Sequence, residues 1–187
     1  MPTRARFAFS FADSHLRIRL KSRPSGRLFL FESAGMGQDF TDNPQLFITW
    51  DALHRDAVLL SRELRSKGPF KGIIAVARGG LVPAAVAAQE MDLRLIDTVC
   101  ISSYDDTVQR DDLQVLKPIE GDGTQWLVID DIVDSGRTFR QLRKMLPKAY
   151  FAAIYAKPQG QKTVDTVLTL VNQDIWVVFP WETPTQE

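Results

Sequence analysis

The chain has 187 residues, 44% hydrophobic and 25% charged, which is typical of a folded domain with a substantial core and excludes a disordered or fibrous protein. Lys plus Arg and Asp plus Glu both number 23, so a net charge of zero gives no general attraction to nucleic acid. The lone Cys100 excludes an internal disulfide and favours a reducing compartment, and no apolar run approaches the roughly 20 residues of a membrane-spanning helix.

Residues 1–45 differ from the rest of the chain. They are rich in Arg, and their runs LRIRL and RLFLF alternate as short strands do. Gly35, Gly37, Asn43 and Pro44 are typical of a linker. We therefore expect 1–45 to be an N-terminal extension, poorly ordered or the product of an upstream start site, and 46–187 to form one domain.

From residue 47 onward the hydrophobic pattern alternates between strands and helices. A first helix is predicted from an N-cap at Asp51 to the stop at Gly68-Pro69, and further helices at 84–90 and 138–146. Strands are predicted at 72–77, 95–101, 126–129, 150–156 and 164–170. This alternation predicts an α/β fold with a mostly parallel sheet covered by helices on both faces.

The segment 134–138 leads from a predicted strand into a helix, so its backbone N–H groups favour an anion, above all phosphate. Ser135 and Thr138 add hydroxyl donors, and Gly136 allows close approach to the backbone. The alternative is an ordinary helix start, capped by Asp134 or Ser135, with nothing bound.

The preceding pair, Asp130 and Asp131, favours a binding site. Two adjacent carboxylates at the end of a buried strand repel each other and lose hydration unless something uses them. They can accept hydrogen bonds from sugar hydroxyls or coordinate Mg²⁺. Acids for a diol beside donors for a phosphate indicate a site for a ribose 5-phosphate.

These residues carry a resemblance to a known family. The run VIDDIVDSGRT resembles the phosphoribosyl pyrophosphate (PRPP) motif of type I phosphoribosyltransferases, and 47–182 resemble the xanthine-guanine branch, which serves bacterial purine salvage. The resemblance implies the type I phosphoribosyltransferase fold, a mostly parallel sheet flanked by helices with a flexible hood loop. The supporting runs are TWD (49–51), KGIIAVARGGLVP (71–83), DTVCISSYD (97–105), VLK (115–117), EGDG (120–123), AKPQG (156–160) and PW (180–181).

The resemblance implies a role for each residue of the acidic motif. Asp130 and Asp131 would hold the ribose hydroxyls of PRPP, and Asp131 would also be linked to Mg²⁺. The segment 134–138 would cradle the 5-phosphate, and it departs from close relatives at Arg137, where they carry Gly. The residues of this cradle are Asp134, Ser135, Gly136, Arg137 and Thr138.

Two further segments match PRPP-contacting parts of the family. Arg78 and Gly79 match the pyrophosphate loop, in which members often carry a non-proline cis peptide, although ARGG by itself also fits a plain strand-to-helix turn. The long polar segment 102–123 resembles the mobile hood, and Arg110 within it matches a PRPP contact.

The resemblance also implies a purine site. Lys157 would donate to a 6-oxo group, Trp176 would stack on the base, and the main chain near Val177 would contact it. By pattern alone, a Lys at a strand end is usually solvated and a Trp in an apolar run is usually core. Asp134 matches the acid near purine N7, where it would assist proton removal during catalysis.

The implied reaction transfers the phosphoribosyl group of PRPP to N9 of guanine or xanthine, and more weakly hypoxanthine, giving GMP or XMP and pyrophosphate. Two alternatives remain, a PRPP-binding regulatory protein of the same fold and a hypoxanthine-preferring enzyme. The family further implies a homotetramer in the cytoplasm, with peripheral contact to the inner membrane, and no nucleic-acid partner.

Overall fold

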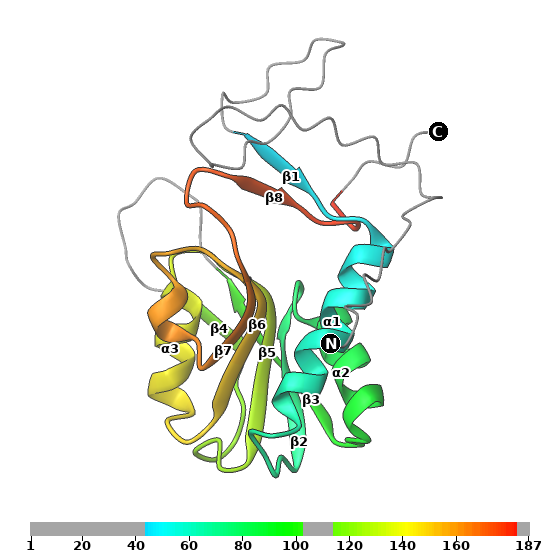
Figure 1. Cartoon of the computed structure of the whole chain (residues 1–187). Helices are drawn as coiled ribbons and strands as arrows, with labels where there is room; N and C mark the ends of the chain where they lie inside the picture. The colour runs from blue at the N-terminus through cyan, green and yellow to red at the C-terminus, as the bar shows by residue number, and fades with distance from the viewer. Residues whose placement is uncertain (1–43, 103–113, 183–187) are drawn as a thin grey trace, which may run out of the picture. The chain divides into compact units, whose positions relative to one another are not determined.

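The computed structural model describes residues 44–102 and 114–182, which form two sheets and three α-helices (Figure 1). The predicted hood contact Arg110 and residues 1–43 lie outside the described residues. The elements are β1 (Gln45–Phe47), α1 (Trp50–Leu64), β2 (Gly72–Ala77), α2 (Leu81–Met91), β3 (Ile96–Ser102), β4 (Gln114–Lys117), β5 (Trp126–Val133), α3 (Arg137–Met145), β6 (Tyr150–Ala156), the 3₁₀ turn η1 (Gln161–Thr163), β7 (Thr166–Leu170) and β8 (Trp176–Val178).

The main sheet confirms the predicted architecture. Its strand order is β4-β3-β2-β5-β6-β7, and every neighbouring pair is parallel except β3 and β4. Helices α1 and α2 lie on one face of this sheet and α3 on the other (Figure 1). The carboxyl ends of β2, β5 and β6 therefore meet at one edge of the sheet, where ligands of parallel sheets bind.

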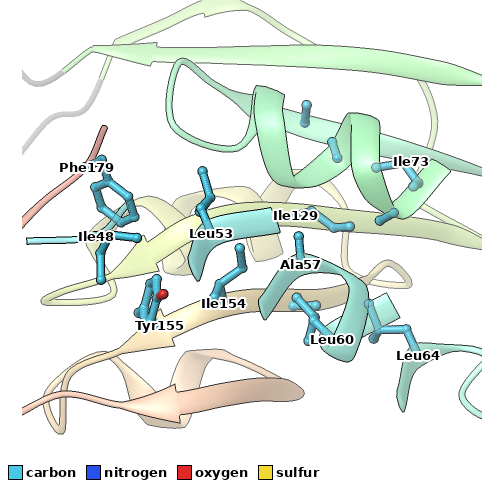
Figure 2. Close-up of a cluster of buried hydrophobic side chains, with 14 of the residues drawn as sticks. Ile48, Leu53, Ala57, Leu60, Leu64, Ile73, Ile129, Ile154, Tyr155 and Phe179 are labelled. Atoms are coloured by element: carbon cyan, nitrogen blue, oxygen red, sulfur yellow. The ribbon is translucent and has the colours of Figure 1, made fainter. Parts of the chain in front are cut away.

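The core on the α1 side explains why the first helix forms where its apolar residues recur. Four residues at helical spacing point into the sheet, and they pack with Ile129 and Ile154 in one buried cluster (Figure 2). They are Leu53, Ala57, Leu60 and Leu64, each at most 1% exposed. On the opposite face, Phe139 and Leu142 of α3 pack in a second cluster with Phe151 of β6.

The first helix begins differently from the prediction. Its N-cap is Thr49, whose Oγ1 accepts a hydrogen bond from the Ala52 N–H at 3.2 Å, and Asp51 lies within the first turn. The prediction of Asp51 as the cap is therefore wrong. Thr and Asp both suit the start of a helix, and the hydrophobic pattern does not distinguish two positions that are only two residues apart.

Strand β5 is longer than predicted and runs to Val133. Asp130 pairs with Ala153 of β6, and Ile132 pairs with Tyr155, so the acidic pair lies within the strand rather than after it. The segment predicted to be a hood loop also contains β4, which pairs antiparallel with β3. Both differences have one cause: a neighbouring strand extends pairing into polar sequence.

A second, two-stranded sheet joins β1 and β8 in parallel, with Leu46 opposite Val177. The pairing continues past the strand ends, where the Ile48 N–H donates to the Val178 carbonyl at 2.9 Å. Gln45, the last residue of the predicted extension, opens β1. Within the described ranges, no helix has the length and apolar character needed to cross a membrane.

Candidate active site

A cavity of about 850 Å³ opens at the carboxyl ends of β2, β5 and β6, beside β8. The cavity is lined by residues that are far apart in the sequence, and seven of these were predicted as site residues. These seven are Arg78, Gly79, Asp131, Asp134, Lys157, Trp176 and Val177.

A smaller pocket of about 130 Å³ lies at the start of α3, lined by Asp130 and by the predicted phosphate segment from Asp134 to Thr138. Gly136 is the N-cap of α3, with φ 77°. It has no side chain, so the helix start has no side-chain capping hydrogen bond. The alternative in which Asp134 or Ser135 caps the helix is therefore wrong. The Thr163 side chain lies 2.9 Å from where a Cβ at Gly136 would stand, so the turn requires glycine.

The acidic pair is nearly inaccessible. Asp130 is 9% exposed and Asp131 8%, and their oxygens accept from backbone N–H groups, Asp130 Oδ1 from Asp131 at 3.0 Å and Asp131 Oδ1 from Ile132 at 2.6 Å. Burial is the main cause that raises the pKa of both carboxyls, that of Asp131 to about 6. The charge of Asp131 further raises the pKa of Asp130, and that of Glu182 raises the pKa of Asp131.

The Arg78–Gly79 turn lies directly against this pair. A Cβ at Gly79 would stand 2.3–2.5 Å from the Asp131 carboxylate atoms, so only glycine leaves room for that carboxylate. The Ala77–Arg78 peptide bond is cis, as it often is in the family that the sequence resembles. The ARGG segment is thus a strand-to-helix turn that also forms one wall of the cavity.

Lys157 does not extend into solvent. Its side chain is 7% exposed, and its Nζ lies 3.0 Å from Asp134 Oδ2, while the other oxygen, Oδ1, accepts from Gln173 Nε2 at 2.8 Å. The solvated-lysine alternative is therefore wrong. The buried ammonium faces a cavity in which it can donate to an acceptor on a ligand.

Trp176 is 57% exposed and lines the cavity, so the alternative of a core tryptophan is also wrong. Val177 is buried at 7%, which leaves chiefly its main chain to serve a ligand. Nearby, Trp181 stacks on Phe179 with ring centroids 4.9 Å apart and lies 6.0 Å from Trp50. These rings make the cavity wall beside β8 aromatic.

The lining or supporting residues that were not predicted include Trp50, Gln173, Trp181 and Glu182. The PW run at 180–181 marked the position of Trp181 without a role. Glu182, whose carboxylate accepts from the Phe179 N–H at 3.0 Å, follows that run and could have been considered. No pattern marks Gln173, because a single amide in a turn has no periodicity.

The carboxylates of the site suit Mg²⁺ only if a substrate supplies further oxygen atoms to the ion. Among residues 44–102 and 114–182, no group of three or more His, Cys, Asp or Glu side chains could hold a metal. Mg²⁺ is usually bound by one or two carboxylates plus substrate phosphates and water, and Asp131 with its neighbour Asp130 offers such carboxylates. A cation there would also offset the burial that chiefly raises their pKa values and the charge of Asp131 that further raises the pKa of Asp130.

The site combines three kinds of chemistry within one cavity system. Buried carboxylates can accept from sugar hydroxyls, and the N–H groups and hydroxyls at the start of α3 can hold a phosphate. Lys157 and Trp176 offer a hydrogen-bond donor and an aromatic face to a flat ring carrying an oxo group. A phosphorylated sugar and a heterocyclic base can thus lie side by side.

Comparisons with known proteins agree with this chemistry. The phosphoribosyl transferase domain family matches residues 50–187. The chain is 57% identical to a xanthine-guanine phosphoribosyltransferase of Nitratidesulfovibrio vulgaris over 74% of its own length and 85% of that protein. It is 53% identical to the xanthine-guanine phosphoribosyltransferase of Desulfotalea psychrophila, over 74% and 87% of the two chains.

A solved structure shares the fold. The purine phosphoribosyltransferase of Pyrococcus horikoshii superposes with a TM-score of 0.64 at 26% identity, covering 76% of this chain and 98% of that one. The chain therefore belongs to the type I phosphoribosyltransferases, within their xanthine-guanine branch.

Proposed function

We propose that this protein transfers the 5-phosphoribosyl group of PRPP to N9 of guanine or xanthine, and more weakly hypoxanthine, forming GMP or XMP and pyrophosphate. One observation carries the proposal: a buried ammonium, a carboxylate and an exposed indole converge in the cavity that also contains Asp131. They are Lys157, Asp134 and Trp176. The enzymatic names of the similar proteins favour this over a regulatory protein that binds PRPP without turnover.

In this proposal PRPP spans both pockets. Asp130 and Asp131 accept from the ribose hydroxyls, and the segment 134–138 binds the 5-phosphate through its N–H groups and the hydroxyls of Ser135 and Thr138. Arg78 and Gly79 bind the pyrophosphate, and Arg110 adds a hood contact. The exposed Arg137, at the first position of α3, adds positive charge beside the phosphate.

Asp131, assisted by Asp130, would hold Mg²⁺ together with oxygens of PRPP. When bound, the ion would supply positive charge for the pyrophosphate leaving group. Two buried carboxylates side by side support the role, because a bound cation would stabilise their ionised forms, which burial disfavours.

The purine lies between the face of Trp176 and the donor at Lys157, which hydrogen-bonds the 6-oxo group. Asp134 accepts the proton that the ring nitrogens lose as N9 attacks C1 of PRPP. The bond from C1 to pyrophosphate oxygen breaks, and the protein contributes positioning and charge stabilisation rather than a covalent intermediate.

Pyrophosphate release from PRPP, measured with guanine, xanthine, hypoxanthine and adenine in turn, tests the proposal. Lys157 cannot accept a hydrogen bond, so a 6-amino group would set donors against its ammonium and offer it no acceptor, and adenine is expected to be inert. We expect kcat/KM to fall in the order guanine, xanthine, hypoxanthine. Lys157→Ala should depress turnover of all three, because they share the contact. Adenine turnover comparable to that of guanine, or fastest turnover with hypoxanthine, would contradict it.

We further propose a homotetramer in the cytoplasm with peripheral contact to the inner membrane. Exposed apolar side chains at the cavity, Trp50 at 55% and Leu81 at 42%, support self-association, and the single cysteine supports a reducing compartment. The membrane contact rests on the family resemblance alone. Light scattering coupled to gel filtration tests the tetramer, and co-sedimentation with inner-membrane vesicles tests the contact.

A further inference from the structure

We propose that Gln173 is a positioning residue that fixes the Asp134 carboxylate for its role at the purine. The inference rests on the proposed function, because it concerns how the proposed proton acceptor is held. Gln173 lies in the connection between β7 and β8, three residues before Trp176, and no motif that we identified in the sequence includes it.

Asp134 needs support from outside its own segment. It directly follows β5, and its side chain is 51% exposed, so its torsions are not fixed by packing. Each carboxylate oxygen instead has one donor from another part of the chain, Oδ2 from Lys157 at 3.0 Å and Oδ1 from Gln173 Nε2 at 2.8 Å. Two donors on opposite oxygens define the plane of the carboxylate, which neither does alone.

The other end of the Gln173 amide is also used. Its Oε1 accepts from the Gln159 N–H at 3.1 Å, in the turn directly after Lys157. That turn is held by the Gly160 N–H, which donates to the Lys157 carbonyl at 3.0 Å. One side chain therefore links the turn that carries Lys157, the residue that follows β5 and the connection that leads to Trp176.

The Gln173 amide can make both contacts at any pH. The Asp134 carboxylate accepts and the Gln159 N–H donates, so the linking group needs a donor at one end and an acceptor at the other. Lys157 has a second task in the proposed mechanism, donating to the purine. Gln173 keeps Asp134 in place whether or not a base is bound, so the two functional side chains can act at once.

Two substitutions separate the two ends of the amide. Gln173→Leu removes both contacts. Gln173→Glu keeps an acceptor for the Gln159 N–H and almost the same shape, but it replaces the donor to Asp134 with a repelling carboxylate. Asn172→Ala, at an exposed adjacent amide, is the control.

We expect both Gln173 variants to lower kcat for guanine by about 10- to 100-fold, with the KM for PRPP within about twofold of the natural chain. The Gln173→Glu defect, relative to the natural chain at the same pH, should shrink as the pH falls from about 8 to about 5.5. The Asp134 carboxylate beside it raises the pKa of the introduced carboxyl, which, once protonated, can donate to Asp134 again. Asn172→Ala should leave kcat and KM unchanged. A purely structural role for Gln173 predicts no such pH dependence.

A double-mutant cycle with Asp134→Ala decides the outcome. If Gln173 acts through Asp134, Gln173→Leu should cost nothing further in the Asp134→Ala background. A Gln173→Glu enzyme with unchanged kcat would overturn the inference about Gln173. In that case the Asp134→Ala variant by itself would still test whether Asp134 is the proton acceptor. Full turnover by Asp134→Ala would overturn the proposed role of Asp134, and with it the inference. Pyrophosphate release without any effect of Gln173 would leave the proposed function intact.

Discussion

The contact between Gly79 and Asp131 couples the two loops that are proposed to bind PRPP. A single added carbon at Gly79 would overlap the carboxylate, at 2.3 Å from its Oδ2. Because Asp131 is buried and accepts from the Ile132 N–H, it cannot move aside without losing that hydrogen bond. The absence of a side chain at Gly79 is thus a requirement of the acidic pair.

We therefore expect Gly79→Ala to weaken Mg²⁺–PRPP binding by at least about 10-fold, the equivalent of one displaced charged contact. Isothermal titration calorimetry measures the affinity. Gly121→Ala is the matched control, since it has φ 87° but nothing within 4 Å of the added carbon. It should cost stability and leave the affinity unchanged, and equal losses of affinity in both variants would refute the coupling.

A substitution in the acidic pair should affect Mg²⁺–PRPP binding and the stability of the fold in different ways. Asp131→Asn keeps the shape and the acceptor for the Ile132 N–H but removes the charge. Mg²⁺–PRPP affinity should fall about 10- to 150-fold, corresponding to about 1.5–3 kcal/mol for one charge-assisted contact. Calorimetric titration checks this, and wild-type affinity in the variant would rule out the proposed role.

In the absence of ligand and metal, the same substitution should stabilise the chain above pH 6. The folded chain raises the pKa of Asp131 from 3.8 to about 6, so it binds this proton more tightly than the unfolded chain. The free energy of unfolding therefore falls as the pH rises from about 4 to about 6, by about 3 kcal/mol at full ionisation.

Urea unfolding in a chelator at pH 4.5 and 7.5 tests this sign. The stability gain of Asp131→Asn over the natural chain should be larger at pH 7.5 than at pH 4.5. A gain that is equal at both pH values, or larger at the lower one, would show that the buried carboxyl does not titrate as its surroundings indicate.

At the level of elements, the start of α1 depends on Thr49 rather than on Asp51. The Thr49 hydroxyl satisfies a first-turn N–H that no intrahelical carbonyl can reach, whereas Asp51 acts only through its charge near the helix N-terminus. α1 carries Leu53, Ala57 and Leu60 into the core, so fraying at its start also loosens the wall that includes Trp50.

Thr49→Ala should lower the free energy of unfolding by about 1 kcal/mol, and Asp51→Ala by about 0.3–1 kcal/mol. The two substitutions differ further in salt: the Asp51→Ala loss should shrink at high ionic strength, while the Thr49→Ala loss should persist. Denaturant unfolding at low and high salt checks both, and a Thr49→Ala effect that disappears in salt would contradict the capping contact.

At the level of the whole molecule, the described domain begins with β1. That strand pairs with β8, and the register sets Leu46 opposite Val177 next to the exposed Trp176. The family match starts at residue 50, but β1 precedes it and supports the wall of the cavity that carries β8. We therefore propose that the boundary that matters for function is the start of β1 at Gln45.

We propose that residues upstream of β1 are dispensable, and that a chain starting at Met36 folds and is active. It retains Gln45–Phe47 and every described contact of the site. Its kcat/KM for guanine should lie within about twofold of the full chain. A chain that starts at Trp50 and so lacks β1 is the contrasting variant and should lose activity. Loss of activity in the Met36 chain would refute the proposal.

Contiguous patterns were sufficient for much of this molecule. Alternating apolar runs predicted the parallel sheet, and the strands at 72–77 and 150–156 have the expected bounds. The acids at 130–131 and the segment 134–138 are close in sequence, so their proximity near the end of β5 follows from local structure. The resemblance to type I phosphoribosyltransferases rests on the same short runs.

Tertiary structure alone decided the contacts between segments. Asp134 meets Lys157 and Gln173, which are 23 and 39 positions away, and the Asp131 carboxylate meets the backbone at Gly79. Hydrophobic periodicity reports which face of an element is buried over a few residues, but not which turns converge. Convergence depends on strand order, and order is set by the packing of whole layers. For that reason the residue types that carry the chemistry of the site could be predicted from the sequence, while the contacts that orient their side chains could not.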